Sequence, residues 1–356
     1  MTDSFYSGKN ILVTGHTGFK GSWLTMWLKK MGANVTGYAL EPPTNPSLFE
    51  LCQIEKEMES IIGDIRNKET FAKTIKASKP AIIFHLAAQP IIKTSYQNPL
   101  ETFETNIMGT ANLLDILRTT PSAKALVIVT TDKCYHNNES FWGYKEDDRL
   151  GGHDPYSSSK ACCELITDSY QNSFFHPNDY DNHGLAIATA RAGNVIGGGD
   201  FAENRLIPDC VRALEKDEEI KIRNPHAIRP WQHVLEPLSG YLTLAERLYN
   251  EGPKYNGAWN FGPSEDNEKS VQYIVDNFVS LWGKGCWVKY DELDLHETSY
   301  LKLNSYKARQ LLGYQTKWHI DHALKQVVDW TKVYVRDRRC MVDCCIEQIV
   351  EYEGCE

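Results

Sequence analysis

The 356-residue sequence has few of the features that would place a protein in a membrane or on a nucleic acid. It lacks any apolar run near the roughly 18 residues that a membrane-spanning helix needs, so we expect no membrane partner. Acidic residues outnumber basic ones by 47 to 38, which gives a net charge of −9. This surplus excludes a general nucleic-acid-binding protein, although a few local arginines can still bind an anionic substrate.

The ten cysteines lack the paired Cys-x-x-Cys spacing of zinc sites and redox motifs. The stretch MTDSFYSGKN also lacks the basic start and apolar core of a secretion signal, so we expect a cytoplasmic protein with reduced thiols. Cys340, Cys344 and Cys345 lie close together, but no second pair of ligands accompanies them. We therefore expect no metal site.

Short apolar runs alternate with helix-like segments over the first 195 residues. Strands that are apolar on both faces and alternate with helices indicate a parallel sheet covered by helices, which is the doubly wound α/β or Rossmann architecture. The predicted strands are residues 10–14, 34–38, 60–63, 81–86, 125–129 and 185–191, and the predicted helices are 21–31, 105–118 and one that begins near Pro155.

Beyond residue 195, stretches rich in glycine and proline separate shorter elements. We expect residues 1–195, with a returning segment near 231–262, to form the dinucleotide-binding domain. Residues 196–230 and 263–340 would form a smaller mixed α/β lobe that binds the substrate. An amphipathic run over 321–334 predicts a late helix, and residues 341–356 are a tail whose role the sequence does not indicate.

A glycine-rich loop, Thr14-Gly-His-Thr-Gly-Phe-Lys-Gly21, separates the first predicted strand from the first helix. Gly15 permits a tight turn, Gly18 lets the backbone approach a pyrophosphate, and Gly21 allows close packing of helix and strand. The helix N-terminus then faces the anion. Because the loop opens a β-α-β unit, it predicts a dinucleotide site that is formed by Gly15, Thr17, Gly18, Phe19 and Lys20.

The adenosine end of this site is less well determined. Tyr38 stands where an acidic residue would bind the ribose diol, and Glu41 comes late for that role. No arginine stands there to hold a 2′-phosphate, so the residues discriminate weakly between NAD and NADP. Asp64 and Ile65, after the third strand, suit a contact to adenine, and a solvated turn is an equally good alternative.

Tyr156 and Lys160 lie four residues apart and would share one face of a helix. A tyrosine, with an ordinary pKa of about 10, is a poor base at neutral pH. A lysine cation and the positive nicotinamide ring would lower that pKa. Together with the glycine loop and with Thr131 at the end of a strand, this pair resembles the extended short-chain dehydrogenase/reductase family.

Longer stretches narrow the resemblance to the nucleotide-sugar dehydratases, and among them to the branch that acts on CDP-glucose. These stretches are residues 15–23, 37–44, 131–135, 191–200 and 228–237. The resemblance implies NAD as cofactor and the conversion of CDP-D-glucose to CDP-4-dehydro-6-deoxy-D-glucose and water, in deoxysugar biosynthesis such as that of lipopolysaccharide O-antigen. The resemblance also implies further residues of the cofactor site, which are Leu86, Ala87, Ala88, Gln89, Asn106, Thr130, Tyr156 and Lys160.

The resemblance also implies the catalytic roles. Tyr156, assisted by Thr131, would take the proton of the sugar 4-hydroxyl while NAD⁺ accepts the hydride from C4. Asp132 would protonate the departing 6-hydroxyl. Lys133 stands where related dehydratases carry a glutamate that takes the C5 proton, so Lys133 must first lose its own proton. Desolvation and nearby positive charge would favour that loss. The alternative is a surface ion pair between Lys133 and Asp132.

On the substrate side, arginines should converge on the diphosphate. Arg229 resembles the position that holds it in related enzymes, and the further expected contacts are Gln89, Asn194, Arg205 and, less firmly, Arg223. His233 fits a structural role better, and Trp231 fits core packing or substrate contact equally. The competing functions are a sugar-nucleotide 4-epimerase, which needs no Asp132–Lys133 pair, and a non-catalytic dinucleotide sensor, which would lose Tyr156 or Lys160. The resemblance implies a homodimer or homotetramer.

Overall fold

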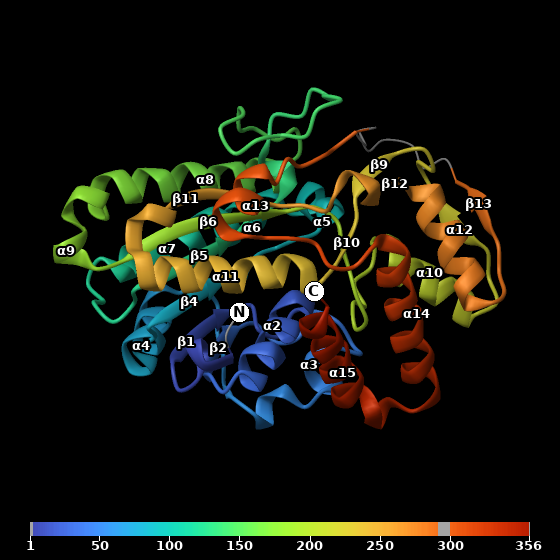
Figure 1. The fold of residues 1–356 in the computed structure, drawn as a ribbon, viewed down its shortest axis with the longest axis horizontal. Coiled ribbons are helices and arrows are strands. Elements are labelled where there is room, and N and C mark those ends of the chain that lie inside the picture. Colours follow the sequence, from blue (N-terminus) through green and yellow to red (C-terminus); the bar gives the residue numbers. More distant parts are fainter. Residues whose placement is uncertain (1–2, 291–299, 356) are drawn as a thin grey trace.

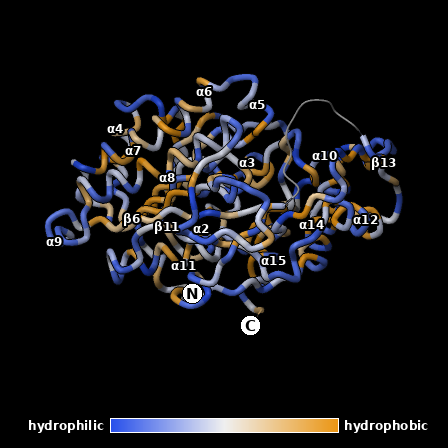
Figure 2. The backbone as a smooth tube through the Cα atoms, turned by 90° about the horizontal axis from the view of Figure 1, so that it is seen from above, coloured by the Kyte–Doolittle hydropathy of each residue, from blue (hydrophilic) through white to orange (hydrophobic). Residues whose placement is uncertain are grey.

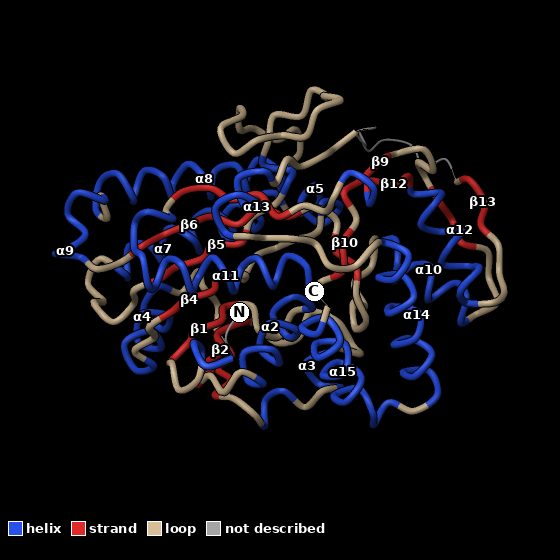
Figure 3. Tube along the Cα trace, viewed as in Figure 1, coloured by secondary structure: helices blue, strands red, loops and turns tan. Residues whose placement is uncertain are grey.

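The centre of the protein is one parallel sheet of seven strands (Figures 1 and 3). The structure is a computed structural model that describes residues 3–290 and 300–355. The expected doubly wound sheet is confirmed, and each predicted strand is present within two residues of its expected ends. In spatial order the strands are β3 (Glu59–Ile62), β2 (Asn34–Ala39), β1 (Asn10–Thr14), β4 (Ile82–His85), β5 (Ala125–Val129), β6 (Ala186–Ala192) and β11 (Gly257–Phe261).

Both faces of the sheet are buried because successive strand residues point into two different cores. Ile11 and Val13 lie in the core beneath α2 and α11, whereas Leu12 lies in the opposite core, beneath α4 and α7. Figure 2 shows apolar chain along β6 and β11 inside the molecule and hydrophilic chain around α9 at its edge. The flanking helices are α2 (Phe19–Lys30), α4 (Lys68–Ser78), α7 (Gly109–Leu117), α8 (Pro155–Phe174), α9 (Tyr180–His183) and α11 (Leu235–Glu251).

Two helices differ in their bounds from the prediction. α2 begins at Phe19, two residues before the predicted start, and it ends before Gly32, whose φ of +79° few other residues adopt. Gly21 therefore lies inside the first turn, where a Cβ would come 2.0 Å from the carbonyl oxygen of Gly15. The segment predicted as helix 105–118 divides into a π-helical turn over Glu104–Met108 and then α7, and it follows α6 (Pro99–Phe103).

The second lobe has a separate apolar core and lies at one end of the molecule (Figure 1). Trp231 is buried in this core, which confirms core packing, but it also lines the large cavity beside the lobe, so a substrate contact stays a prediction. The exact domain boundaries stay a prediction. The main elements of the lobe are α10 (Leu206–Glu215), β8 (Ile220–Ile222), β9 (Ile228–Pro230), β12 (Glu268–Ser270), α12 (Val271–Trp282), β13 (Trp287–Lys289) and α14 (Ile320–Arg336).

The segment after residue 340 is not a loose tail. It forms α15 (Met341–Gly354), which packs against α2 and α14 and buries Ile349 and Tyr352. The Nζ of Lys317 donates to the carbonyl oxygen of Tyr352 at 3.1 Å, so a cation stabilises the helix C-terminus.

The side chain of Cys340 lies outside the described residues. Within the described ranges, no helix combines the length and apolarity needed to cross a bilayer. The remaining short elements are α1 (Asp3–Tyr6), α3 (Leu48–Leu51), α5 (Ile92–Gln97), β7 (Val195–Ile196), β10 (Gln232–His233) and α13 (Tyr306–Leu312).

Candidate active site

A cavity of about 1560 Å³ opens at the carboxyl ends of the sheet strands and extends to the second lobe. Clefts that bind one small ligand usually measure about 300–1,000 Å³, so this cavity has room for two. Nineteen of the predicted site residues line it. They are Gly15, Thr17, Gly18, Phe19, Lys20, Asp64, Ile65, Leu86, Ala87, Ala88, Thr130, Thr131, Lys133, Tyr156, Lys160, Asn194, Arg205, Arg223 and Arg229.

Three predicted site residues, Gln89, Asn106 and Asp132, lie behind the cavity wall instead. Gln89 donates from Nε2 to Oγ1 of Thr102 at 2.9 Å, and its backbone N–H donates to Oδ1 of Asn106 at 2.8 Å. Asn106 also donates to Oγ of Ser159 on α8 at 2.8 Å. These bonds join the loop after β4 to the helix that carries Tyr156. In this structure both amides support the wall, and direct ligand contacts from them stay predictions.

The glycine loop forms one end of the cavity. Gly15 has a φ of +76°, and a Cβ there would lie 2.7 Å from the backbone nitrogen of Ala87. Any other residue would therefore push the loops after β1 and β4 apart. Gly18 is the N-cap of α2, whose first turn contains no acidic residue, so the partial positive charge of the helix end is available to an anion. These residues fit a dinucleotide pyrophosphate.

The adenosine end differs from the usual arrangement because Tyr38 points away from the cavity. Its ring is buried and its hydroxyl donates to the carbonyl oxygen of Asp64 at 3.1 Å. Asp64 lines the cavity but also pairs with Arg66 at 2.6 Å, so a contact to adenine and a solvated turn both stay open for this residue. The segment 39–48 also lines the cavity and contributes Glu41, for which the sequence predicted no role in the site. In the sequence, only the motif at 37–44 pointed to this segment, because its proline-rich chain has neither helix nor strand periodicity.

Helix α8 brings Tyr156 and Lys160 to the end of β5. The helix starts where it does because Asp154 accepts a hydrogen bond from the N–H of Ser157 at 2.9 Å and Pro155 occupies the first position. Lys160 donates from Nζ to the carbonyl oxygen of Val129 at 3.2 Å. Tyr156 forms a hydrogen bond with Thr131. The strand end and the helix together place three predicted catalytic residues on one wall.

Burial dominates the electrostatics of this wall. It raises the pKa of Tyr156 above its ordinary value, and the hydrogen bond with Thr131 opposes only part of that increase. Burial also lowers the pKa of Lys160. Burial and the charge of Arg205 together lower the pKa of Lys20 to about 7. The lowering of the Tyr156 pKa that the sequence suggested is therefore absent without cofactor, and it stays a prediction for the loaded enzyme.

Asp132 and Lys133 begin a short 3-10 turn directly after Thr131. Asp132 is fully buried, and its Oδ1 accepts from Thr131 Oγ1 at 3.0 Å and from Lys133 Nζ at 3.2 Å. Its Oδ2 has no hydrogen-bond partner among the described residues. A Cβ on Gly193 would lie 3.2 Å from that oxygen, so the glycine leaves room for it. Lys133 lines the cavity and Asp132 lies directly behind it, so the pair does not belong to an outer surface.

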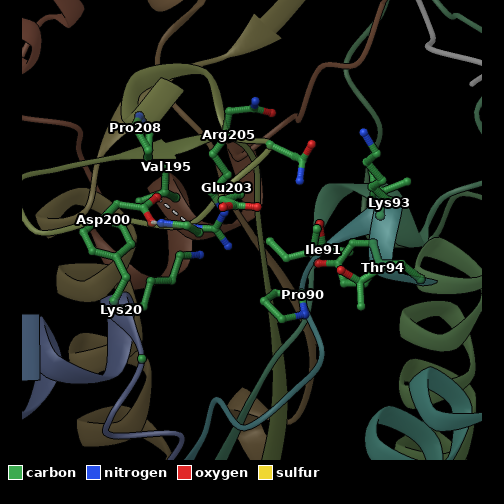
Figure 4. Close-up of a pocket in the computed structure, with 18 of the residues that line it drawn as sticks. Lys20, Pro90, Ile91, Lys93, Thr94, Val195, Asp200, Glu203, Arg205 and Pro208 are labelled. Atoms are coloured by element: carbon green, nitrogen blue, oxygen red, sulfur yellow. Dashed lines mark hydrogen bonds and ion pairs between the residues drawn. The ribbon is translucent and has the colours of Figure 1, made fainter. Parts of the chain in front are cut away.

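The second lobe supplies the opposite part of the cavity, where Arg205, Arg223 and Arg229 line the wall. Figure 4 shows Arg205 paired with Asp200, at 2.9 Å, beside Lys20, with Lys93 and Thr94 across the cavity. Oδ1 of Asn194 is buried without a hydrogen-bond partner in the described part of the chain, as expected of a group that awaits a ligand.

His233 has the structural role that the sequence favoured. It is fully buried and packs against Trp23 and Trp318, with ring centroids 5.9 and 4.8 Å away. Asp200, by contrast, is a cavity residue that the sequence analysis did not assign, although it closes the stretch 191–200 that carried part of the resemblance. A carboxylate that holds an arginine is easily read as a surface acid when only the sequence is known.

Comparison with known proteins places the chain in a family. The family model for GDP-mannose 4,6 dehydratase matches residues 12–327. The chain belongs to this family. Within it, the chain is 50% identical to CDP-glucose 4,6-dehydratase of Salmonella typhimurium over 98% of its own length and 97% of that protein. It is 24% identical to UDP-glucose 4-epimerase of Pisum sativum, over 92% of this chain and 96% of that one.

Solved structures agree with this assignment at the level of the fold. The dTDP-glucose 4,6-dehydratase of Bacillus anthracis, solved in complex with NAD, superimposes with a TM-score of 0.76 at 22% identity, over 95% of this chain and all of that one. The epimerase Mth375 of Methanothermobacter thermautotrophicus gives a TM-score of 0.79 at 23% identity, over 95% and 96% of the two chains. Dehydratases and epimerases therefore share this fold, so the fold alone does not separate them.

Proposed function

We propose that this protein is an NAD-dependent CDP-glucose 4,6-dehydratase, which converts CDP-D-glucose to CDP-4-dehydro-6-deoxy-D-glucose and water. The single observation that carries the proposal is the bond between Lys133, which lines the cavity beside Thr131, and Asp132, which lies directly behind that wall. An epimerase needs only redox chemistry at C4, whereas a dehydratase also needs an acid and a base for elimination. The 50% identity to a CDP-glucose 4,6-dehydratase over nearly the whole chain supports the same substrate.

The cofactor would occupy the part of the cavity between the glycine loop and α8. When bound, NAD⁺ would accept the hydride from C4 of the sugar and return it to C6, so the cofactor ends as it began. Gly15, Gly18 and the N-terminus of α2 would hold the pyrophosphate. Leu86, Ala87 and Ala88 would line the path toward the nicotinamide end.

Tyr156 would remove the proton of the 4-hydroxyl in the oxidation step. Burial holds the pKa of this phenol high, so it needs help to ionise. Thr131 supplies a hydrogen bond, and the charge of Arg205 acts in the same direction. The positive nicotinamide ring would add a third favourable interaction.

The 4-ketone then makes C5–H acidic enough for a protein base to remove its proton. Lys133 would be that base, because its Nζ lies on the cavity wall beside Asp132. Asp132 would donate its proton to the 6-hydroxyl, which leaves as water, and Lys133 would return a proton to C5 when the hydride is delivered to C6. The Oδ2 of Asp132 has no hydrogen-bond partner among the described residues, so this oxygen is available to the leaving group.

The diphosphate of the substrate would bind between the two lobes. Arg205 and Arg229 both line that part of the cavity, and guanidinium groups recognise phosphate oxygens through paired hydrogen bonds. The free Oδ1 of Asn194 would accept from a sugar hydroxyl or from another donor of the substrate. A sugar nucleotide of this kind is made and consumed in the cytoplasm, which is where we expect the protein.

We also propose a homodimer, which can pair further into a tetramer. Large apolar side chains are exposed on α6, on the π-helical turn and on α8, which lie together on one face of the sheet. Leu100 is 75% exposed, Leu165 57% and Met108 54%. Helices of two subunits that pack along this face would form a four-helix bundle and cover these side chains. Light scattering after gel filtration measures the assembly directly.

One assay separates the candidate functions. The protein is incubated with CDP-glucose and NAD⁺, and the products are identified by the alkaline absorbance of 4-keto-6-deoxy sugars and by mass spectrometry. Loss of one water supports the dehydratase. Inversion at C4 without loss of water would support a 4-epimerase instead. If no sugar nucleotide turns over, the non-catalytic sensor becomes the better explanation.

A further inference from the structure

The turn that carries the proposed elimination residues is held at both ends by one buried polar network. At its start, Thr130 donates from Oγ1 to Oε1 of Glu164 at 2.5 Å. At its end, the hydroxyl of Tyr135 accepts from Arg191 at 2.7 Å and donates to Oδ1 of Asn260 at 2.7 Å. The three proposed catalytic residues of the turn, 131–133, lie between these two anchors.

The two anchors are joined to each other by a buried ion pair. Arg191 on β6 donates to Oε2 of Glu164 on α8 at 2.8 Å, and both side chains are at most 5% exposed. Thr189 donates to the same carboxylate oxygen at 2.6 Å. Glu164 lies on α8, one helical turn after Lys160. Because Thr130 donates to its carboxylate, that one group connects α8 with the turn after β5. A displacement of either would break charge-assisted bonds between buried groups.

Neither residue of the pair belongs to the catalytic set that the reaction requires. Glu164 and Arg191 do not line the cavity, and neither contacts a proposed catalytic side chain by a hydrogen bond. The guanidinium of Arg191 lies over the ring of Tyr135, 4.9 Å from its centroid, and also donates to the carbonyl oxygen of Glu146 at 2.9 Å. This many contacts fix a geometry more tightly than burial of a side chain alone would require.

We propose that Glu164 and Arg191 are positioning residues that set the Asp132–Lys133 turn against Tyr156 and Lys160, so that elimination can follow oxidation at one bound sugar. The inference rests on the proposed dehydratase function. Each end of the network serves a different step. The Glu164 end orients Thr131 and α8 for oxidation, and the Tyr135 end orients Asp132 and Lys133 for elimination.

Tyr135→Phe is the sharpest test because it removes one hydroxyl and keeps the ring. Tyr144→Phe is its matched control, because that ring stacks on Tyr135 at 5.1 Å but, among the described residues, its hydroxyl bonds to the 137–138 loop alone. We expect Tyr135→Phe to lower turnover roughly 10-fold or more, as small displacements of catalytic groups do. Oxidation should continue, so the fraction of enzyme with reduced cofactor in the steady state, measured by absorbance, should rise.

Glu164→Gln keeps the shape of the side chain and removes its charge. We expect Glu164→Gln to slow the first formation of reduced cofactor, measured in a single turnover. It should not raise the fraction of enzyme that holds reduced cofactor in the steady state. A purely structural role would change the melting temperature and the amount of active enzyme but leave the balance between the two steps as in the wild type. If Tyr135→Phe has the same turnover and the same fraction of enzyme with reduced cofactor as Tyr144→Phe, the inference is overturned.

The wild-type protein separates failure of this inference from failure of the proposed function. If it forms no 4-keto-6-deoxy sugar from CDP-glucose, the proposed function fails whatever the variants do. If it forms that product and Tyr135→Phe leaves the balance of steps unchanged, only the positioning role fails.

Discussion

The Nζ of Lys133 lies 3.2 Å from Oδ1 of Asp132, and the other oxygen of that carboxyl group has no hydrogen-bond partner among the described residues. A buried acid therefore lies directly behind a basic side chain that lines the cavity. Loss of water across C5 and C6 removes a proton from one carbon and protonates a hydroxyl on the next. A base and an acid that are adjacent in the chain match that geometry, and an epimerase would have no use for them.

Lys133→Met should separate oxidation from elimination. The variant keeps a long side chain but has no basic atom, so C4 oxidation should proceed while removal of the C5 proton slows by about 100-fold or more. Deuterium incorporation at C5 from heavy water measures the affected step, and absorbance of the reduced cofactor measures the preserved one. Lys145→Met is the control, because that lysine is 60% exposed and lies outside the cavity. Native-rate exchange at C5 in Lys133→Met would eliminate Lys133 as the base.

Lys20 should make dinucleotide affinity depend on pH near neutrality. Burial, with the charge of Arg205, lowers its pKa to about 7, so the side chain is charged below pH 7 and neutral above it. A charged amine beside the glycine loop favours the pyrophosphate anion, so affinity should fall roughly 10-fold as pH rises through 7, as loss of a charge-assisted bond predicts.

Fluorescence titration with NADH between pH 6 and 8 measures this dependence for the wild type and for Lys20→Met. The variant should bind weakly throughout, with a flat profile. Lys29→Met, on the same helix but outside the cavity, should retain the slope of the wild type. A wild-type profile without slope would show that Lys20 does not contact the cofactor phosphates.

The fold and most of the site could be predicted from the sequence because local patterns determine them. Strands such as 125–129 are apolar on both faces, which only a sheet covered on both sides explains. Gly15, Thr131 and Tyr156 each follow or face a strand end, and parallel strands bring their carboxyl ends to one edge. Residues far apart in the chain therefore meet without further information.

Burial at individual positions could not be predicted, because it depends on packing between distant segments. Asp132 is hidden behind the wall since Gly193, from the loop after β6, lets the chain close over it. Gln89 and Asn106 bond to each other rather than to the cavity. The docking of α15 depends in part on bonds between residues more than one hundred positions apart, such as Tyr352 with Glu236 and Glu353 with Trp27, and no periodic pattern signals such a contact.

Glu236 should make the protein less stable as pH rises. Burial raises the pKa of this carboxyl from 4.5 to about 7, although Trp318 and Tyr352 donate hydrogen bonds to it. The folded chain therefore holds a proton that the unfolded chain releases, so the free energy of unfolding falls between pH 4.5 and 7, by about 3 kcal/mol for such a shift. Urea unfolding at several pH values should show this decline in the wild type and a flatter profile in Glu236→Gln.

Glu246→Gln, on the same helix but only partly buried, is the control and should keep the wild-type slope. Parallel profiles for the wild type and Glu236→Gln would mean that this carboxyl does not titrate over that range in the folded protein.

Removal of residues 341–356 should destabilise the whole protein, because α15 covers α2 next to the cofactor loop. The helix buries Met341, Ile349 and Tyr352, and each large apolar side chain contributes about 1.5–3 kcal/mol. Their loss is comparable with a total stability of about 5–15 kcal/mol, so the truncated protein should melt well below the full chain. Tyr352→Phe removes one hydroxyl, with its bonds to Glu236 at 2.7 Å and to Ser239 at 3.1 Å, and should cost far less. Calorimetry of the three proteins measures both effects, and equal melting temperatures for the full and truncated chains would make the helix dispensable.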